Sequence, residues 1–162
     1  MDDARAKEVI AVRAYAVAPA EASQSSRIAS FIERVIETSV DASPDEKAAF
    51  IANTRQNLSK WLDAPERCVH LVAHNDGELA GEVLVREFWN LCHLFVAPEH
   101  QSRGLGRRLL EEALAACAGR SPRGVIRLNS SRNAVGFYKR HGFVEAQDVP
   151  DVYRGVQFVR PV

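Results

Sequence analysis

The stretch VAPEHQSRGLGRRL, residues 96–109, has the residue types of an anion-binding loop. Its glycines at 104 and 106 would let the backbone approach a ligand closely and would leave successive amide N–H groups exposed. A helix is predicted to follow from about Gly104 to Ala118, and helix N-termini favour anions through unpaired donors and the helix dipole. Positive charge nearby comes from Arg103, Arg107 and Arg108. A phosphate or pyrophosphate suits this chemistry, although an ordinary tight loop before a helix fits as well.

A second stretch, LNSSRNAVGFYKRHGF at residues 128–143, could supply a proton donor. It is predicted to contain a short helix over about Arg132 to His141, which carries Tyr138 and is closed by Gly142 before a strand begins. A tyrosine phenol has a pKa of about 10, so it is protonated at neutral pH and can act as a general acid. The alternative is that Tyr138 is only an aromatic side chain packed on Phe143.

The two stretches together resemble the two signatures of the GNAT N-acetyltransferase family. The matching residues are Gln101-x-x-Gly104-x-Gly106 and Ala134-x-x-Phe137-Tyr138-x-x-x-Gly142-Phe143. The resemblance covers about residues 68 to 147. It implies an acetyl-CoA-dependent acyltransferase that needs no metal, with an amine attacking the thioester directly. It also implies one domain with an α+β fold over residues 1–162. The sheet would be mixed, mostly antiparallel and twisted, with about six to seven strands, and would be splayed at its central parallel strand pair. About four helices would accompany it.

The resemblance also implies roles for particular residues. The pantetheine arm would pair with the backbones of Leu94, Phe95 and Val96, and a backbone N–H near Leu94 would stabilise the oxyanion. Tyr138 would lie near the thioester sulfur and protonate the leaving thiolate. The pyrophosphate would rest on the amides of Gln101, Ser102, Arg103, Gly104, Leu105, Gly106 and Arg107. Many members have an asparagine that contacts the cofactor where this chain has Ser131. Ser131, Asn129 and Asn133 are therefore the alternative candidates for this contact.

The general base is left open by the sequence. Some family members have a glutamate eleven residues before the glutamine of the loop, but this chain has Asn90, which cannot take a proton. His93 is titratable near neutral pH, although strand alternation would turn it away from the face of Asn90. Glu82 and Glu87 are alternatives, and a solvated surface position fits each of these three. A non-catalytic acyl-CoA-binding regulatory module is therefore the competing function, while an intact Tyr138 favours the enzyme.

Cys68, His70 and His74 would share one face of a strand and could in principle bind zinc. Side chains on one strand face point roughly parallel rather than toward a common centre, and no fourth ligand is evident. The sequence favours a strand with one polar face and no metal site.

Periodicity predicts the elements that would position these residues. A helix is expected over about 24–39, and a second from the capping box of Ser43, Pro44 and Glu46 to about Leu62, with Ile51, Leu58 and Leu62 along one side. A turn is expected at Asn75-Asp76-Gly77, because Asn75 and Gly77 tolerate positive φ. Strands are expected over about 9–17, 68–74, 79–87, 88 or 89–96, 124–128, 143–147 and 156–159.

Composition excludes several classes of protein. The chain has 162 residues, of which 46% are hydrophobic and 26% charged, as in a globular domain. Lys+Arg and Asp+Glu both number 21, so the formal net charge is zero. The chain therefore has no net positive charge to attract nucleic acid or an anionic membrane. No apolar run approaches the roughly 20 residues of a membrane span, and the first ten residues are not typical of a signal peptide, so we expect a cytoplasmic protein. A homodimer is left open.

The acceptor is also left open between a small amine and a protein N-terminus or lysine. The N-terminal helices, Phe88, Trp89, Asn90 and the segment 148–154 are expected to contact it. Glu145, Asp148 and Asp151 could attract a cationic amine, although a short acidic turn is usually only solvated.

Overall fold

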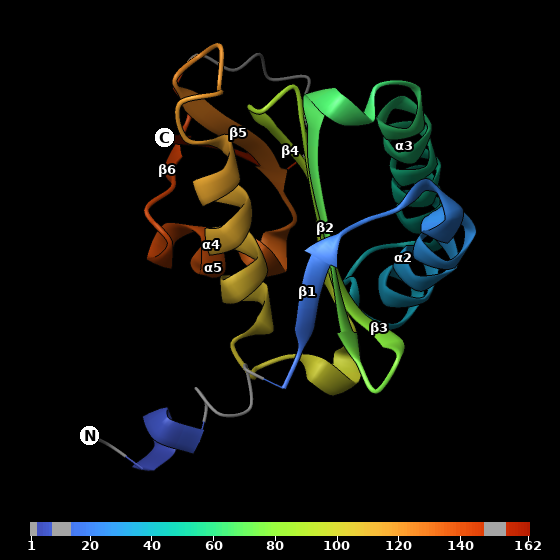
Figure 1. Cartoon of the computed structure of the whole chain (residues 1–162). Helices are drawn as coiled ribbons and strands as arrows, with labels where there is room; N and C mark the ends of the chain where they lie inside the picture. The colour runs from blue at the N-terminus through green and yellow to red at the C-terminus, as the bar shows by residue number, and fades with distance from the viewer. Residues whose placement is uncertain (1–2, 8–13, 148–154) are drawn as a thin grey trace.

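A seven-stranded sheet forms the centre of the domain in the computed structural model, which describes residues 3–7, 14–147 and 155–162 (Figure 1). The strand order is β1-β2-β3-β4-β5-β7-β6, and every neighbouring pair is antiparallel except β4 and β5, which are parallel. The strands are β1 (Ala16–Pro19), β2 (Cys68–Asn75), β3 (Glu78–Arg86), β4 (Asn90–Val96), β5 (Val125–Ser130), β6 (Val144–Glu145) and β7 (Val156–Pro161). This arrangement confirms the predicted α+β fold with one central parallel pair.

Helices cover both faces of the sheet (Figure 1). One face carries α2 (Ser25–Ser39) and α3 (Pro44–Asp63), and the other carries α4 (Leu105–Cys117) and α5 (Val135–Arg140). Single turns of 3₁₀ helix occur at Ala22–Gln24, Pro65–Arg67, Pro98–His100 and Arg132–Ala134. The amphipathic faces of α2 and α4 produce two apolar cores, one on each side of the sheet.

The starts of the helices follow the sequence signals. Ser43 Oγ accepts a hydrogen bond from the backbone N–H of Glu46 at 3.2 Å, and the Glu46 carboxylate accepts one from the Ser43 N–H at 3.0 Å. This is the predicted capping box, with Pro44 at the first helical position. On α3, however, the buried residue near the end is Trp61, at 3% exposure, whereas Leu62 is 42% exposed. The prediction that Leu62 lies on the buried side was therefore wrong, and the neighbouring Trp61 packs there instead.

Other differences from the predictions are local. The predicted strand over 9–17 falls partly on residues 8–13, outside the described part, and β1 begins at Ala16. At the hairpin turn, Asp76 and Gly77 have positive φ, rather than Asn75. The strand predicted over 143–147 is limited to Val144 and Glu145. Arg108 on α4 is half-buried, and its guanidinium donates to the Tyr15 carbonyl at 2.9 Å.

The parallel pair β4–β5 separates soon after it forms. Pairing is confined to Asn90 with Arg127 and Leu91 with Leu128, so among the described residues β4 from Cys92 to Val96 has no partner on its β5 side. On its other side β4 pairs with β3 as far as Val96. The predicted splay is therefore present, and it leaves one edge of β4 free at the end nearest the loop that leads into α4.

A β-bulge in β4 changes which side chains share a face. Leu84 pairs with His93 but Val85 pairs with Leu91, so Cys92 is an extra residue in the ladder. Because Arg86 pairs with Asn90, both Asn90 and His93 lie on the face covered by α2 and α3. The prediction that His93 points to the opposite face from Asn90 was wrong, since simple alternation does not hold across a bulge.

Candidate active site

A cavity of about 1040 Å³ opens beside the free edge of β4, between the start of α4 and α5. Of the residues predicted to bind a cofactor or act in catalysis, those lining this cavity are Leu94, Val96, Gln101, Ser102, Gly104, Gly106, Arg107, Asn133 and Tyr138. The structure therefore brings both sequence motifs to one site, although they are separated by the whole of α4 and β5.

The remaining predicted site residues do not line this cavity. Phe95, Asn129 and Ser131 face other cavities described below. Leu105 is buried in the core at 1% exposure, and Arg103 is exposed. Among the three alternatives for the second motif, Asn133 is the one that lines the cavity, and its Oδ1 accepts a hydrogen bond from Ser131 Oγ at 2.9 Å.

The backbone of the glycine loop has the geometry of a ligand-approach site. Gly104 caps α4 in the left-handed conformation, with φ of 82°, which strongly favours glycine. The nearest atoms to a Cβ at Gly106 would be those of Val96 and Phe137, at 3.6 Å or more, so a side chain there would enter the cavity rather than clash with the protein. Gln101 Nε2 donates to the Val96 carbonyl at 3.1 Å and ties the loop to the end of β4.

The cavity wall is positively charged. Among the described lining residues the arginines are Arg107, Arg140 and Arg160, and the one acid, Glu111, accepts from Arg107 Nε at 2.9 Å. Burial and the nearby Arg107 lower the pKa of His141, another lining residue. Guanidinium groups are well suited to polyphosphates. Arg140 and Arg160 were missed by sequence reasoning, and for Arg160, on the last strand, no sequence signal could have found it.

A second cavity of about 390 Å³ lies on the other side of the splayed strands, under α3. It shares three lining residues with the first cavity, namely Leu94, Ala134 and Tyr138. Asn90, Phe95, Asn129 and Ser131 line it too. A third hollow of about 600 Å³, near the start of α3, shares six lining residues with it, namely Val40, Phe50, Asn53, Asn129, Ser130 and Ser131. The acids of this hollow, Asp41, Asp45 and Glu46, do not line the second cavity. The two main cavities therefore meet at Tyr138, where a group could pass from one ligand to another.

Tyr138 combines a packed ring with a free hydroxyl. Its ring centroid lies 5.6 Å from that of Phe143 and 6.2 Å from that of Phe158. Within the described residues its hydroxyl makes no hydrogen bond, although both cavities reach the residue. Burial raises the pKa of Tyr138, so the phenol keeps its proton at neutral pH. Packing on Phe143 and a capacity to donate a proton are both compatible with this position.

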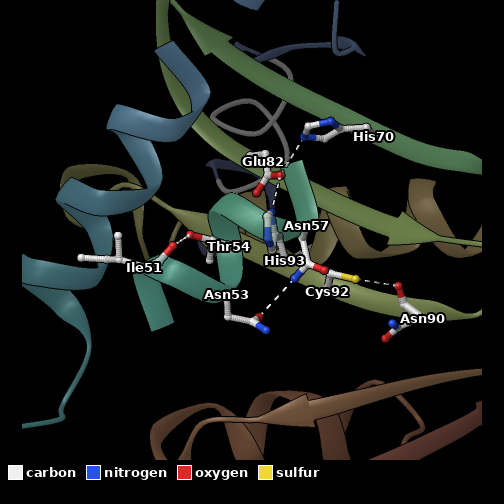
Figure 2. Close-up of polar contacts among 9 residues, drawn as sticks. All are labelled: Ile51, Asn53, Thr54, Asn57, His70, Glu82, Asn90, Cys92 and His93. Atoms are coloured by element: carbon white, nitrogen blue, oxygen red, sulfur yellow. Dashed lines mark hydrogen bonds and ion pairs between the residues drawn. The ribbon is translucent and has the colours of Figure 1, made fainter. Parts of the chain in front are cut away.

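The candidate bases Glu82 and His93 form a buried cluster with His70 (Figure 2). Glu82 Oε1 accepts from His70 Nε2 at 2.7 Å and from His93 Nδ1 at 3.1 Å. Burial acts to raise the pKa of Glu82, but His93 and His70 outweigh it and bring the pKa to about 2. A solvated surface position for Glu82 or His93 is therefore wrong, and neither lines the second cavity.

The other polar candidates are also accounted for. Glu87 forms an ion pair with Arg67. His70, one of the three residues weighed for zinc, contacts Trp61 edge-on and Glu82. Over residues 3–7, 14–147 and 155–162, no three His, Cys, Asp or Glu side chains gather as a metal site would require. Asp148 and Asp151, expected near the acceptor, fall outside the described residues.

Comparison with known families and structures agrees with this geometry. The acetyltransferase (GNAT) domain family matches residues 38–160. No curated protein matches the chain. A GCN5-related N-acetyltransferase structure from Rhodopseudomonas palustris is similar at 18% identity and a TM-score of 0.73, covering 91% of this chain and 95% of that one.

Two further solved structures are similar and contain coenzyme A. The PaiA N-acetyltransferase of Thermoplasma acidophilum, in complex with coenzyme A, is 15% identical with a TM-score of 0.74, covering 91% of this chain and 99% of that one. N-acetylglutamate synthase of Neisseria gonorrhoeae, complexed with coenzyme A and N-acetyl-glutamate, is 18% identical with a TM-score of 0.62, covering 91% of this chain and 35% of that one. Within the described part of the chain, no helix has the length and apolar character needed to span a membrane.

Proposed function

Since the chain belongs to the GNAT acetyltransferase family, we propose that it transfers the acetyl group of acetyl-CoA to a primary amine by direct attack. The observation that carries this proposal is the meeting of two cavities at Leu94, Ala134 and Tyr138. A donor bound in the larger cavity and an acceptor bound in the smaller one would bring their reacting groups together at this junction, which is the positioning that group transfer requires.

The larger cavity is the proposed acetyl-CoA site. Its pyrophosphate would rest on the amides of the Gln101–Arg107 loop, with Arg107, Arg140 and Arg160 as counter-charges. The pantetheine arm would pair with the unpartnered edge of β4 at Leu94 to Val96. Two of the similar structures named above hold coenzyme A, which supports coenzyme A as a ligand of this fold. Asn133 is the preferred side-chain contact of the second motif because it lines this cavity.

In the proposed reaction the amine nitrogen attacks the thioester carbonyl carbon and the C–S bond breaks. A backbone N–H near Leu94 would stabilise the oxyanion. Tyr138 would give its proton to the leaving thiolate. Among the described residues that line the acceptor cavity there is no Asp, Glu or His, so the amine proton would leave to water.

The test is a turnover screen with acetyl-CoA and a panel of amines, read as release of free thiol, with acetyl-CoA binding measured by calorimetry in parallel. We expect amine-dependent thiol release that Tyr138→Phe reduces while acetyl-CoA binding is unchanged. Tight acetyl-CoA binding with no amine-dependent release at any pH would instead indicate the regulatory acyl-CoA-binding module.

A further inference from the structure

We propose that the acceptor amine carries a carboxylate, and that Arg86 binds this carboxylate in the smaller cavity. The inference rests on the proposed transfer reaction and names the chemical class of its acceptor. It predicts amino acids or related amino carboxylates as substrates, and it argues against polyamines and other purely cationic amines.

The charge of the acceptor cavity is the first argument. Over the described part of the chain, its lining residues include two cations, Arg86 and Lys60, and no acid. The remaining polar wall is rich in amides, among them Asn53, Asn57 and Asn90. A cavity with this balance repels a polyamine and attracts a ligand that bears negative charge.

Arg86 itself lacks a counter-charge. It is half-buried at the end of β3, and over the described residues no carboxylate pairs with it. The next residue, Glu87, is committed to Arg67. The nearby Cys92 thiol offers no charge either, because burial raises its pKa to about 11 and keeps it neutral. A half-buried guanidinium without an anion is costly, and a planar carboxylate is the group that best matches its paired N–H donors.

The hydrogen bonds of Arg86 extend this donor character along α3. Arg86 can only donate, so Asn57 must present Oδ1 to Arg86 Nη1, at 3.0 Å. Asn57 Nδ2 then donates to Asn53 Oδ1 at 3.2 Å, as Figure 2 shows. Asn53 is left with its own NH₂ group as a donor at the cavity wall. The chain of bonds therefore presents N–H groups to the ligand, as an anion site requires.

Asn90 fits the same explanation. It pairs across the sheet with Arg86, on the face that lines the cavity. A glutamate at position 90 would lie opposite the guanidinium and could neutralise it, whereas the uncharged amide leaves Arg86 available. A cation near the acceptor also favours the neutral form of the amine over the ammonium, which supports attack in a cavity without a base.

The experiment compares matched acceptors in the whole protein. Each amino acid of a panel is paired with its own amide, which keeps the amine and removes the carboxylate, and spermidine serves as the cationic probe. The readout is kcat/KM, corrected for the fraction of neutral amine. We expect the wild type to prefer the carboxylate of at least one pair by about tenfold or more, and to use spermidine poorly.

Variants then assign the preference to Arg86. We expect Arg86→Gln to lower kcat/KM for the carboxylate by about 10- to 100-fold, the range for loss of a charged hydrogen-bonded partner, and to leave the amide within about threefold. Arg86→Lys should restore part of the preference. Arg55→Gln is the matched control, since Arg55 is an exposed arginine on α3, the helix above the cavity, and does not line it, and it should change neither substrate.

The outcomes separate the two proposals. Turnover of amines with no carboxylate preference, a preference for spermidine, or equal losses on carboxylate and amide in a folded Arg86→Gln would overturn the carboxylate site while acetyl transfer stands. Acetyl-CoA binding without turnover of any amine would overturn the transfer activity, and the acceptor assignment with it.

Discussion

Replacement of Glu82 by Gln tests the buried histidine–carboxylate cluster. The carboxylate is fully buried and its pKa is lowered from 4.5 to about 2. A lowered pKa means that the folded state favours the charged carboxylate. The contribution of Glu82 to the free energy of unfolding is therefore complete above about pH 5.5 and is lost as pH falls toward 2. A shift of this size corresponds to about 3 kcal/mol of unfolding free energy at pH 7, of which about 2 kcal/mol is lost by pH 3.

The assay is urea unfolding followed by tryptophan fluorescence at pH 7, 5 and 3 at constant ionic strength. Trp61 reports on the cluster directly, because its ring lies 4.2 Å from that of His70. We expect Glu82→Gln to be less stable than the wild type by about 3 kcal/mol at pH 7 and by about 1 kcal/mol at pH 3. Glu82→Gln removes the carboxylate that accepts from both His70 and His93, so the difference between the two curves reports on the cluster as a whole.

Glu99→Gln is the control for this experiment. Glu99 pairs with Arg34, but its side chain is 53% exposed, so we expect a change below about 0.5 kcal/mol at every pH. A wild type and a Glu82→Gln variant that lose equal stability between pH 7 and pH 3 would refute the assignment of a charged carboxylate to this cluster.

Three further predictions concern the site. Gly106→Val should lower coenzyme A affinity, measured by calorimetry, at least about tenfold. The valine side chain enters the larger cavity, and overpacking costs about 1–3 kcal/mol. Ala115→Val, on the exposed side of α4, should leave the affinity unchanged. Tyr138→Phe should reduce turnover by roughly ten- to a thousandfold with little change in Tm or acetyl-CoA affinity, and wild-type turnover under rate-limiting chemistry would make Tyr138 a packing residue only. His93→Gln should lower Tm, because His93 is buried. It should not change the pH profile, in which kcat/KM rises toward the pKa of the acceptor amine, because His93 does not line the acceptor cavity. An inflection near pH 6.5 that disappears in this variant would identify His93 as the base.

The family, the fold and the larger cavity were accessible from sequence because their signals are local. Glycines in a loop before an amphipathic helix specify backbone conformation directly, and Gly104 has the left-handed φ that such a loop requires. The helix boundaries of α2 and α3 follow the apolar spacing and the Ser43 capping box for the same reason. Tyr138 was found because the short helix and its closing glycine are contiguous in the chain.

The acceptor side was decided by the tertiary structure. The extra residue Cys92 in β4 places His93 on the same face as Asn90. This bulge is defined only by the pairing of β4 with β3. Burial of Glu82 between two histidines needs three strands side by side, which alternation along one strand cannot reveal. Arg86 and Asn57 are 29 residues apart, and Arg160 joins the larger cavity only because β7 pairs with β5. Sequence spacing specifies the local conformation of a segment, but which side chains meet, and which charges are left without partners, depends on how distant segments pack.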